Sequence, residues 1–113
     1  MKKVTIARRE IGEGQPAFII AELSANHNQD YDLAMRTIKA AKDAGADAIK
    51  FQTYTADTLT MNSDKGYFKI KHGTLWDGET LYSLFQKAYT PWDWQPKLKE
   101  YAESIGLICF SSP

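Results

Sequence analysis

The chain has 113 residues, about the size of one small domain, and 43% of them are hydrophobic, which is ordinary for a folded protein. Its 14 basic and 14 acidic residues balance to zero without a long run of one sign, which argues against a nucleic acid or a membrane surface as the partner. The single cysteine, Cys109, excludes an internal disulfide and favours a reducing, cytoplasmic location.

The N-terminal region is expected to be extended. The sequence predicts a strand at residues 3–11 and a turn at 12–16, and pairing with Ala17–Ile20 would complete a hairpin. The run at 17–21 is short and apolar throughout, which is typical of a buried strand. It ends in Glu22, which places a carboxylate at the end of this strand.

A polar loop at 23–29 leads into a helix predicted over residues 31–44. Asp30 can accept a backbone N–H and cap the helix, and Gly45 can supply its left-handed stop. Four apolar residues recur at helical spacing: Leu33, Ala34, Ile38 and Ala41. A second apolar run follows at 47–53, so the sequence predicts a βαβ unit with parallel strands.

The strand predicted at residues 47–53 carries a lysine and a glutamine near its end. Lys50 and Gln52 are two residues apart, so strand alternation points both to the same side. Burying an unpaired ammonium is very costly. Lys50 therefore has two interpretations: a cation that binds an anionic ligand at the strand end, or a lysine that reaches solvent at a strand edge.

Residues 54–79 show no clear periodicity. Loops of this length inside compact domains are usually functional or mobile. The stretch contains Tyr67, Lys71 and His72 among other aromatic and polar residues. Such a mixture suits a polar ligand the size of a sugar, or a lid with packed aromatic side chains.

Helices and a third strand are expected in the remainder of the chain. The predicted elements are helices at 80–88 and 93–105 and an apolar strand at 107–110. The three buried strands would then each end in polar groups, which are Glu22, Lys50 with Gln52, and Ser111 with Ser112. Ligands of parallel α/β folds bind at the carboxyl ends of the strands, so these residues are the candidate site.

The alternation of strands and helices predicts an α/β fold, either a doubly wound sheet or a (β/α)₈ TIM barrel. A complete barrel needs about 250 residues. Because the chain stops directly after its third buried strand, we expect residues 1–113 to be the N-terminal part of the barrel domain of a larger protein.

Several motifs carry a family resemblance. Residues 20–28 (IAELSANHN), 44–54 (AGADAIKFQTY) and 110–113 (FSSP) together resemble the sialic acid synthase family. Within that family, three segments are most similar to the branch that makes pseudaminic acid: 73–78, 88–92 and 109–113. The resemblance extends over essentially the whole chain from Phe18 onward.

Members of that family condense phosphoenolpyruvate with the open-chain aldehyde of an acetamido sugar, releasing phosphate and giving a nine-carbon keto acid. For the pseudaminic acid branch the sugar is 2,4-diacetamido-2,4,6-trideoxy-altrose. The resemblance implies a homodimer with an antifreeze-like C-terminal domain. It also implies a divalent metal, Mn²⁺ or Mg²⁺, whose histidine ligands lie beyond residue 113, so that neither His27 nor His72 is a ligand.

The resemblance also implies roles for the strand-end residues. Lys50, Gln52 and Ser112 would bind phosphoenolpyruvate, whose carboxylate and phosphate require a cation and hydrogen-bond donors. Glu22 would lie beside the reacting centre, where a carboxylate can orient or deprotonate the attacking water. The alternative is that Glu22 simply forms a structural ion pair with Lys50.

The sugar is expected to contact Tyr67, Lys71 and His72, because family members present sugar-binding groups on this loop; a solvated basic loop is the alternative. His27 is expected to brace the first loop rather than to contact substrate. Three other functions stay open: an N-acetylneuraminate or legionaminic acid synthase, a Schiff-base aldolase that uses Lys50, and an inactive fragment that associates through its unpaired strand edges.

Overall fold

The computed structural model describes residues 2–71 and 73–113 of the chain. In chain order the elements are β1 (Val4–Ile6), β2 (Arg9–Ile11), β3 (Ile20–Ser24), α1 (Tyr31–Asp43), β4 (Ala48–Gln52), α2 (Ala56–Leu59), η1 (Gly66–Phe68), α3 (Leu81–Ala88), η2 (Trp92–Trp94), α4 (Gln95–Ser104) and β5 (Ile108–Ser112). Among the helices in these two ranges, none combines the length and the apolar character that a bilayer crossing requires.

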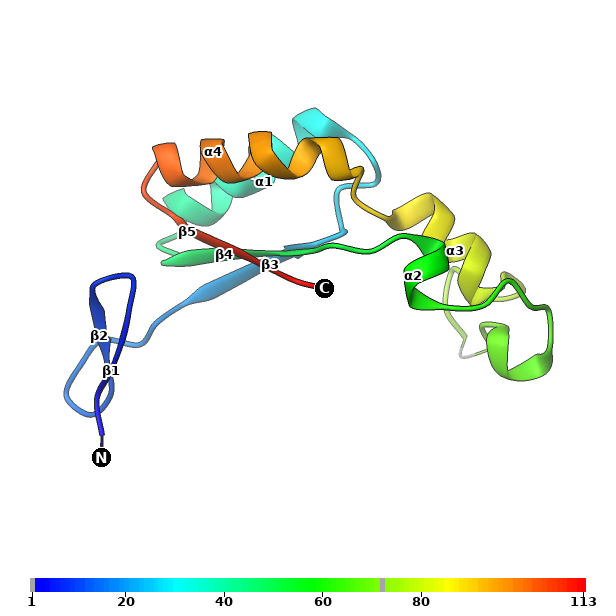
Figure 1. The fold of residues 1–113 in the computed structure, drawn as a ribbon, viewed down its shortest axis with the longest axis horizontal. Coiled ribbons are helices and arrows are strands. Elements are labelled where there is room, and N and C mark those ends of the chain that lie inside the picture. The colour runs from blue at the N-terminus through cyan, green and yellow to red at the C-terminus, as the bar shows by residue number, and fades with distance from the viewer. Residues whose placement is uncertain (1, 72) are drawn as a thin grey trace.

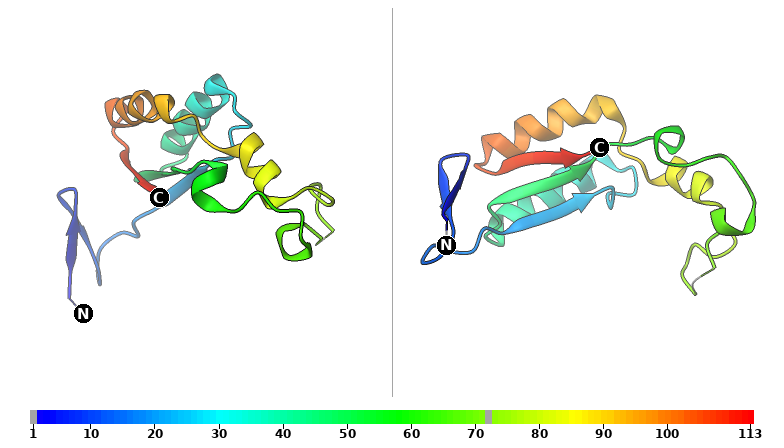
Figure 2. Two further views of the ribbon diagram at one scale, coloured as in Figure 1. Left: turned by 45° about the vertical axis from the view of Figure 1, so that its right-hand side comes forward. Right: turned by 60° about the horizontal axis from the view of Figure 1, so that its bottom comes forward.

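Three parallel strands form the centre of the molecule, in the order β3-β4-β5. Helices α1 and α4 lie next to each other on one face of this sheet (Figure 1). The other views show that no helix of the described chain covers the opposite face (Figure 2). The α/β class with a parallel sheet, predicted from the alternation of elements, is therefore confirmed. We call the uncovered side the bare face.

The core lies between the two helices and the sheet. Helix α1 begins as predicted, because the Asp30 carboxylate accepts the Leu33 N–H at 3.0 Å, and Gly45 follows the helix with a φ of 95°. Eight buried side chains make up the core cluster: Leu23, Ala34, Ile38, Ile49, Phe51, Leu98, Ala102 and Leu107. They come from both helices and from the strands or their immediate flanks, so the helix layer and the sheet are held together as one packed unit.

The N-terminal hairpin differs from the prediction. Strands β1 and β2 pair with each other across a two-residue turn at Ala7 and Arg8, whose φ values are 47° and 68°. The expected pairing with Ala17–Ile20 was therefore wrong. Two-residue hairpin turns often need positive φ at both positions, and they are usually marked by Asn-Gly or Asp-Gly. The Ala-Arg pair carries no such signal.

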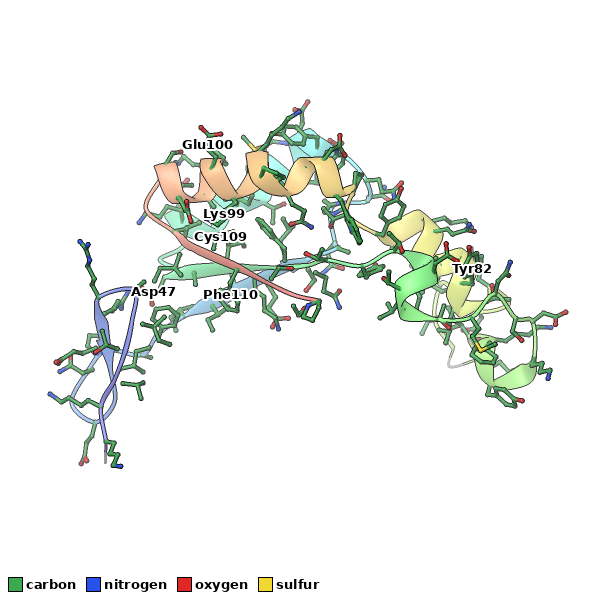
Figure 3. All side chains as sticks on the ribbon, in the orientation of Figure 1. Asp47, Tyr82, Lys99, Glu100, Cys109 and Phe110 are labelled. Carbon is green, nitrogen blue, oxygen red and sulfur yellow. The ribbon has the colours of Figure 1, made fainter. Side chains whose placement is uncertain are left out.

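Asp47 attaches this hairpin to the parallel sheet. Its carboxylate accepts the Ile19 N–H at 2.8 Å and forms an ion pair with the Arg9 guanidinium, which also lies over the Phe18 ring at 5.5 Å. The Ile19 N–H and the Arg9 charge lower the pKa of Asp47 from its ordinary value. Figure 3 shows Asp47 beside the hairpin, at the end of the sheet away from the chain's C-terminus.

Residues 54–71 and 73–79 extend beyond the carboxyl ends of the strands (Figure 1). The stretch contains two short helices, α2 and η1, and is otherwise irregular, much as its lack of periodicity predicted. The Thr55 hydroxyl caps α2, and the Tyr82 hydroxyl donates to Asp57 at 3.0 Å, which ties α2 to α3. The excursion is therefore attached to the following helix rather than to the sheet's bare face.

Candidate functional site

A carboxylate and an ammonium pair on the bare face. Glu22 and Lys50 are neighbours in the strand register, and Lys50 Nζ lies 3.1 Å from Glu22 Oε1. The flanking residues Ile49 and Phe51 are 1% and 2% exposed in the helix-covered core, so alternation directs Lys50 to the other side. The Lys50 side chain keeps 30% of its surface exposed, and the Glu22 side chain keeps 57%. Exposed ion pairs contribute only about 0–1 kcal/mol, so an arriving anion can displace Glu22 from Lys50.

An amide and a hydroxyl lie two residues further along the same face. Gln52 and Ser112 are register partners on β4 and β5. The Ser112 hydroxyl is 3.5 Å from the Phe51 carbonyl oxygen, at the limit of a hydrogen bond, so it remains available to a ligand. Ser111 has the opposite parity, and its hydroxyl lies 2.6 Å from that of Thr53.

The structure thus gathers four of the predicted site residues on one face of three adjacent strands. An ammonium, a carboxylate, an amide and a hydroxyl are available there: Lys50, Glu22, Gln52 and Ser112. Their individual roles in catalysis stay predictions. The arrangement can hold a small anion, because the cation and the neutral donors converge at the carboxyl ends of the strands.

The end of β3 is irregular. The pairing with β4 shifts between Glu22 and Ser24, and Ser24 adopts a φ of 54°. Asn28 and Gln29, in the loop that follows, have φ values of 51° and 52°. Left-handed conformations are uncommon for residues other than glycine, and they cluster where loops contact ligands. This loop is therefore held in a specific shape by its surroundings.

A cavity of about 630 Å³ adjoins the amide of the strand-end site. Its lining residues are Ser24, Ala25, Asn26, Asn28, Gln52, Tyr54, Trp76, Leu84, Lys87 and Ala88. Amide, aromatic and aliphatic side chains predominate. The one cationic group, Lys87, pairs with Glu79 at 2.8 Å, which offsets its charge. The cavity is therefore suited to a neutral, polar molecule with apolar substituents.

The residues predicted to contact a sugar are placed differently. Tyr67 is 77% exposed on η1, Lys71 is exposed as well, and neither lines the cavity beside Gln52. His72 lies outside the described residues. Sequence reasoning instead missed Lys87 as a cavity residue, because a lysine on an amphipathic helix is indistinguishable from a solvated one. The signal that could have found the other wall is the polar loop directly after the first buried strand.

His27 is completely buried behind the cavity wall. Its Nδ1 accepts the Gln29 N–H at 3.0 Å, and its Nε2 lies 2.6 Å from the Thr90 hydroxyl. The Trp94 ring packs against it edge-on, with the ring centroids 5.3 Å apart. Burial lowers the pKa of His27 from its ordinary value, so the neutral ring is favoured. These contacts support the predicted bracing role.

Neither the thiol nor a metal cluster offers a second chemistry within the described residues. Burial raises the pKa of Cys109 to about 11, so the reactive thiolate is disfavoured. Figure 3 shows Cys109 and Lys99 between β5 and α4, with Phe110 on the other side of the strand. In residues 2–71 and 73–113 no group of three or more His, Cys, Asp or Glu side chains is arranged to hold a metal ion.

Known proteins include several relatives of this chain. A family model described as the NeuB family matches residues 37–113, which include Lys50, Gln52 and Ser112. The chain is 58% identical over 96 residues to a pseudaminic acid synthase of Campylobacter jejuni, covering 85% of the chain and 28% of that protein. It is 54% identical over 99 residues to the pseudaminic acid synthase of Helicobacter pylori, covering 88% and 29%. The chain therefore spans less than a third of the length of these curated relatives.

A solved structure has the same arrangement of elements. The crystal structure of N-acetylneuraminic acid (sialic acid) synthetase from Leptospira borgpetersenii, in complex with citrate, superposes with a TM-score of 0.77 at 29% sequence identity. The match covers 99% of this chain and 34% of that chain. The alignment therefore extends over nearly the whole of this chain.

Proposed function

The chain belongs to the NeuB family, and from this premise we propose that it is part of a synthase that condenses phosphoenolpyruvate with the open-chain aldehyde of an acetamido sugar. The sugar is 2,4-diacetamido-2,4,6-trideoxy-altrose, and the products are pseudaminic acid and phosphate. The identities of 58% and 54% to two pseudaminic acid synthases support this branch of the family.

The Glu22–Lys50 pair on the bare face is the observation that carries the proposal. Phosphoenolpyruvate brings a carboxylate and a phosphate, and an ammonium held 3.1 Å from an exposed carboxylate can exchange that partner for the substrate. Gln52 and Ser112 then add an amide and a hydroxyl as donors on the same face. In the Leptospira neighbour, the bound citrate is likewise a small, multiply charged carboxylate.

The exchange of partners also prepares the carboxylate for chemistry. C3 of phosphoenolpyruvate forms a bond to the aldehyde carbon, whose oxygen takes up a proton, and C2 becomes cationic. Water then attacks C2 and loses one proton, the bond between C2 and the phosphate oxygen breaks, and the remaining hydroxyl proton passes to the departing phosphate to leave the keto acid. Glu22, released from Lys50 by the substrate, would take the proton from that water, and its place beside Lys50 on the same face supports this role.

The cavity beside Gln52 is the proposed site for the sugar. Asn26 and Asn28 can pair with the acetamido groups, since an amide side chain offers both a donor and an acceptor. Trp76 and Leu84 supply apolar surface for the acetyl methyls and the deoxygenated carbon. A volume of about 630 Å³ lies within the usual range for small-molecule sites.

The architecture proposed for the whole protein is a TIM barrel, of which residues 1–113 form the N-terminal portion. The bare face would then line the barrel interior, which accounts for the exposure of Ile20 (44%) and Phe110 (42%). An antifreeze-like C-terminal domain, a homodimer and a cytoplasmic location belong to the same proposal.

A divalent metal, Mn²⁺ or Mg²⁺, is also part of the proposal, and it would polarise the aldehyde carbonyl as a Lewis acid. The described residues do not fit such an ion, because they contain no cluster of three candidate ligands. Its ligands are therefore proposed to come from outside this chain, and no step assigned to Glu22 or Lys50 depends on it.

The test is an assay of the synthase that carries this chain, with phosphoenolpyruvate, a divalent metal and, in turn, the three acetamido sugars from which pseudaminic, legionaminic and N-acetylneuraminic acid are made. We expect phosphate release and a nine-carbon product, with kcat/KM at least about tenfold higher for the diacetamido-trideoxy-altrose. A preference for either other sugar would move the protein to another branch. Absence of phosphate release with all three would refute the synthase. Borohydride labelling of Lys50 in the presence of substrate would indicate an aldolase instead.

A further inference from the structure

The cavity proposed for the sugar has two walls that come from distant parts of the chain. One wall is the loop at residues 24–28, and the other includes Leu84, Lys87 and Ala88 of α3. Two hydrogen bonds between residues outside the lining join these walls. His27 Nε2 lies 2.6 Å from Thr90 Oγ1, and Gln29 Nε2 donates to the Tyr89 carbonyl oxygen at 2.9 Å. Residues 89 and 90 directly follow α3, so the bonds fix this helix end against the loop.

The first of these bonds has a defined direction. A backbone N–H can only donate, so the Gln29 N–H requires an unprotonated Nδ1 on His27. The ring proton is therefore on Nε2 and is donated to the Thr90 hydroxyl. Both residues are buried, with exposures of 0% and 1%. Water cannot readily replace either partner, so this contact is rigid.

The loop needs an external constraint of this kind. Asn28 and Gln29 have positive φ values, which a loop of non-glycine residues does not keep unless its surroundings impose them. His27 stands between Asn26 and Asn28, the two amide residues of the cavity lining, but is not itself part of that lining. A change in the His27 contact would therefore move both amides.

We propose that the His27–Thr90 hydrogen bond, which we call the clasp, is a positioning device. It sets the distance between the loop at residues 24–28 and α3, and thereby the affinity of the cavity for the sugar. The inference rests on the function proposed above. Of the three residues proposed to bind phosphoenolpyruvate, Lys50 and Ser112 do not line the cavity, whereas Gln52 borders it. The clasp joins His27 to Thr90 and includes none of these three residues, so we expect it to act on the sugar far more than on phosphoenolpyruvate.

The test uses the synthase that carries this chain and three variants. Thr90→Val keeps the shape of the side chain but removes the acceptor, and Thr90→Ser keeps the hydroxyl as the matched control. Gln29→Met removes the hydrogen bond to the Tyr89 carbonyl oxygen. Gln29 is exposed, so this variant can replace Thr90→Val in the test if Thr90→Val fails to fold. We expect Thr90→Val to raise KM for the sugar about tenfold, with KM for phosphoenolpyruvate and kcat within twofold of the parent. Thr90→Ser restores the parent value, and Gln29→Met gives a smaller rise in the same constant.

Amide hydrogen exchange supplies a second measurement. We expect faster exchange at residues 24–29 in Thr90→Val, with the amides of β4 unchanged. Equal changes in the KM values for both substrates, or no change in either, would refute the positioning role of the His27–Thr90 contact. The proposed synthase function would be unaffected by that result. If the parent protein turns over none of the candidate sugars, the proposed function fails, and the clasp as a device for sugar affinity falls with it.

Discussion

At the scale of single residues, the contact between Glu22 and Lys50 gives the carboxylate a testable role. Glu22→Gln keeps the shape and an oxygen that Lys50 can donate to, but the amide cannot take a proton from water. We expect kcat of the synthase to fall about 100-fold or more, with KM for phosphoenolpyruvate changed by less than about threefold. Steady-state phosphate release measures both constants.

The control for this variant is Asp43→Asn, which breaks an exposed pair with Lys39 on α1, 2.6 Å long and remote from the strand ends. It should leave both constants unchanged. Near-normal turnover in Glu22→Gln would remove the proton-transfer role, and Glu22 would then be a structural partner of Lys50.

His27 makes the stability of the fold depend on pH. Burial lowers its folded-state pKa below the ordinary value of 6.5, so the unfolded chain takes up a proton more readily than the folded one. The stabilisation is fully present above pH 6.5 and is lost as the pH falls below it.

Urea unfolding of the parent and of His27→Gln at pH 7.5 and 5.5 checks this prediction. The glutamine does not titrate, so the difference between the two chains isolates His27 from every other titrating group. We expect the free energy of unfolding of the parent to fall more than that of the variant. An identical pH dependence in both would contradict it.

At the scale of elements, α4 depends on the packing of one apolar stripe against the sheet. Leu98 is 0% exposed and belongs to the core cluster, so Leu98→Ala should lower the free energy of unfolding by about 2–5 kcal/mol. Lys97→Ala on the exposed side of the same helix should change it by less than about 0.5 kcal/mol. Chemical denaturation compares the two. Equal costs would mean that α4 does not pack in this orientation.

The N-terminal hairpin depends on an electrostatic contact rather than on a core. Asp47→Asn keeps an oxygen for the Ile19 N–H but removes the charge that holds Arg9. We expect faster amide hydrogen exchange in residues 4–11, with β4 and β5 protected as before. The Asp43→Asn chain should show no change in the hairpin. Unchanged exchange there in Asp47→Asn would show that other contacts hold β1 and β2.

The same elements show why some of the structure follows from the sequence and some does not. Helix α1 is predictable because its signals are local: Asp30 caps it, apolar residues recur at its period, and Gly45 follows it. The hairpin turn at Ala7 and Arg8 has no local signal, and its position relative to the sheet depends on a long-range contact with Asp47. Tertiary contacts override local propensity at such places.

The candidate site divides in the same way. Strand alternation and parallel pairing place Lys50, Gln52 and Ser112 on one face, so these residues follow from periodicity alone. The cavity depends instead on the positions of Trp76 and Lys87, which are set by the path of the irregular segment between β4 and α3. No repeating pattern encodes that path, so the composition of the region predicts Tyr67 and Lys71 as sugar contacts although neither residue lines the cavity.

At the scale of the whole molecule, the described chain is more open than a closed domain. Its radius of gyration is 16.9 Å, against about 13 Å for a compact chain of this length. The hairpin projects at one end and residues 54–71 and 73–79 at the other, and a single layer of helices covers the sheet (Figure 2). The bare face exposes the apolar side chains of Ile20 and Phe110, and a sheet needs a second layer or closure on itself to bury such surface. A barrel would supply the closure.

Phe110 distinguishes a bare face that stays open from one that becomes a barrel interior. It projects from β5 away from the helices and is 42% exposed, so Phe110→Ala in residues 1–113 should cost roughly 1–2 kcal/mol of unfolding free energy. In a closed barrel the same ring would be buried, and the cost should rise to about 3–5 kcal/mol. Phe51→Ala is the control, because Phe51 is 2% exposed already and should be costly in both proteins. Denaturant unfolding of both variants, in the short chain and in the full synthase, makes the comparison. If Phe110→Ala costs the same in the two proteins, the bare face is not enclosed, and Lys50 with Glu22 would then face open solvent rather than the interior of a barrel.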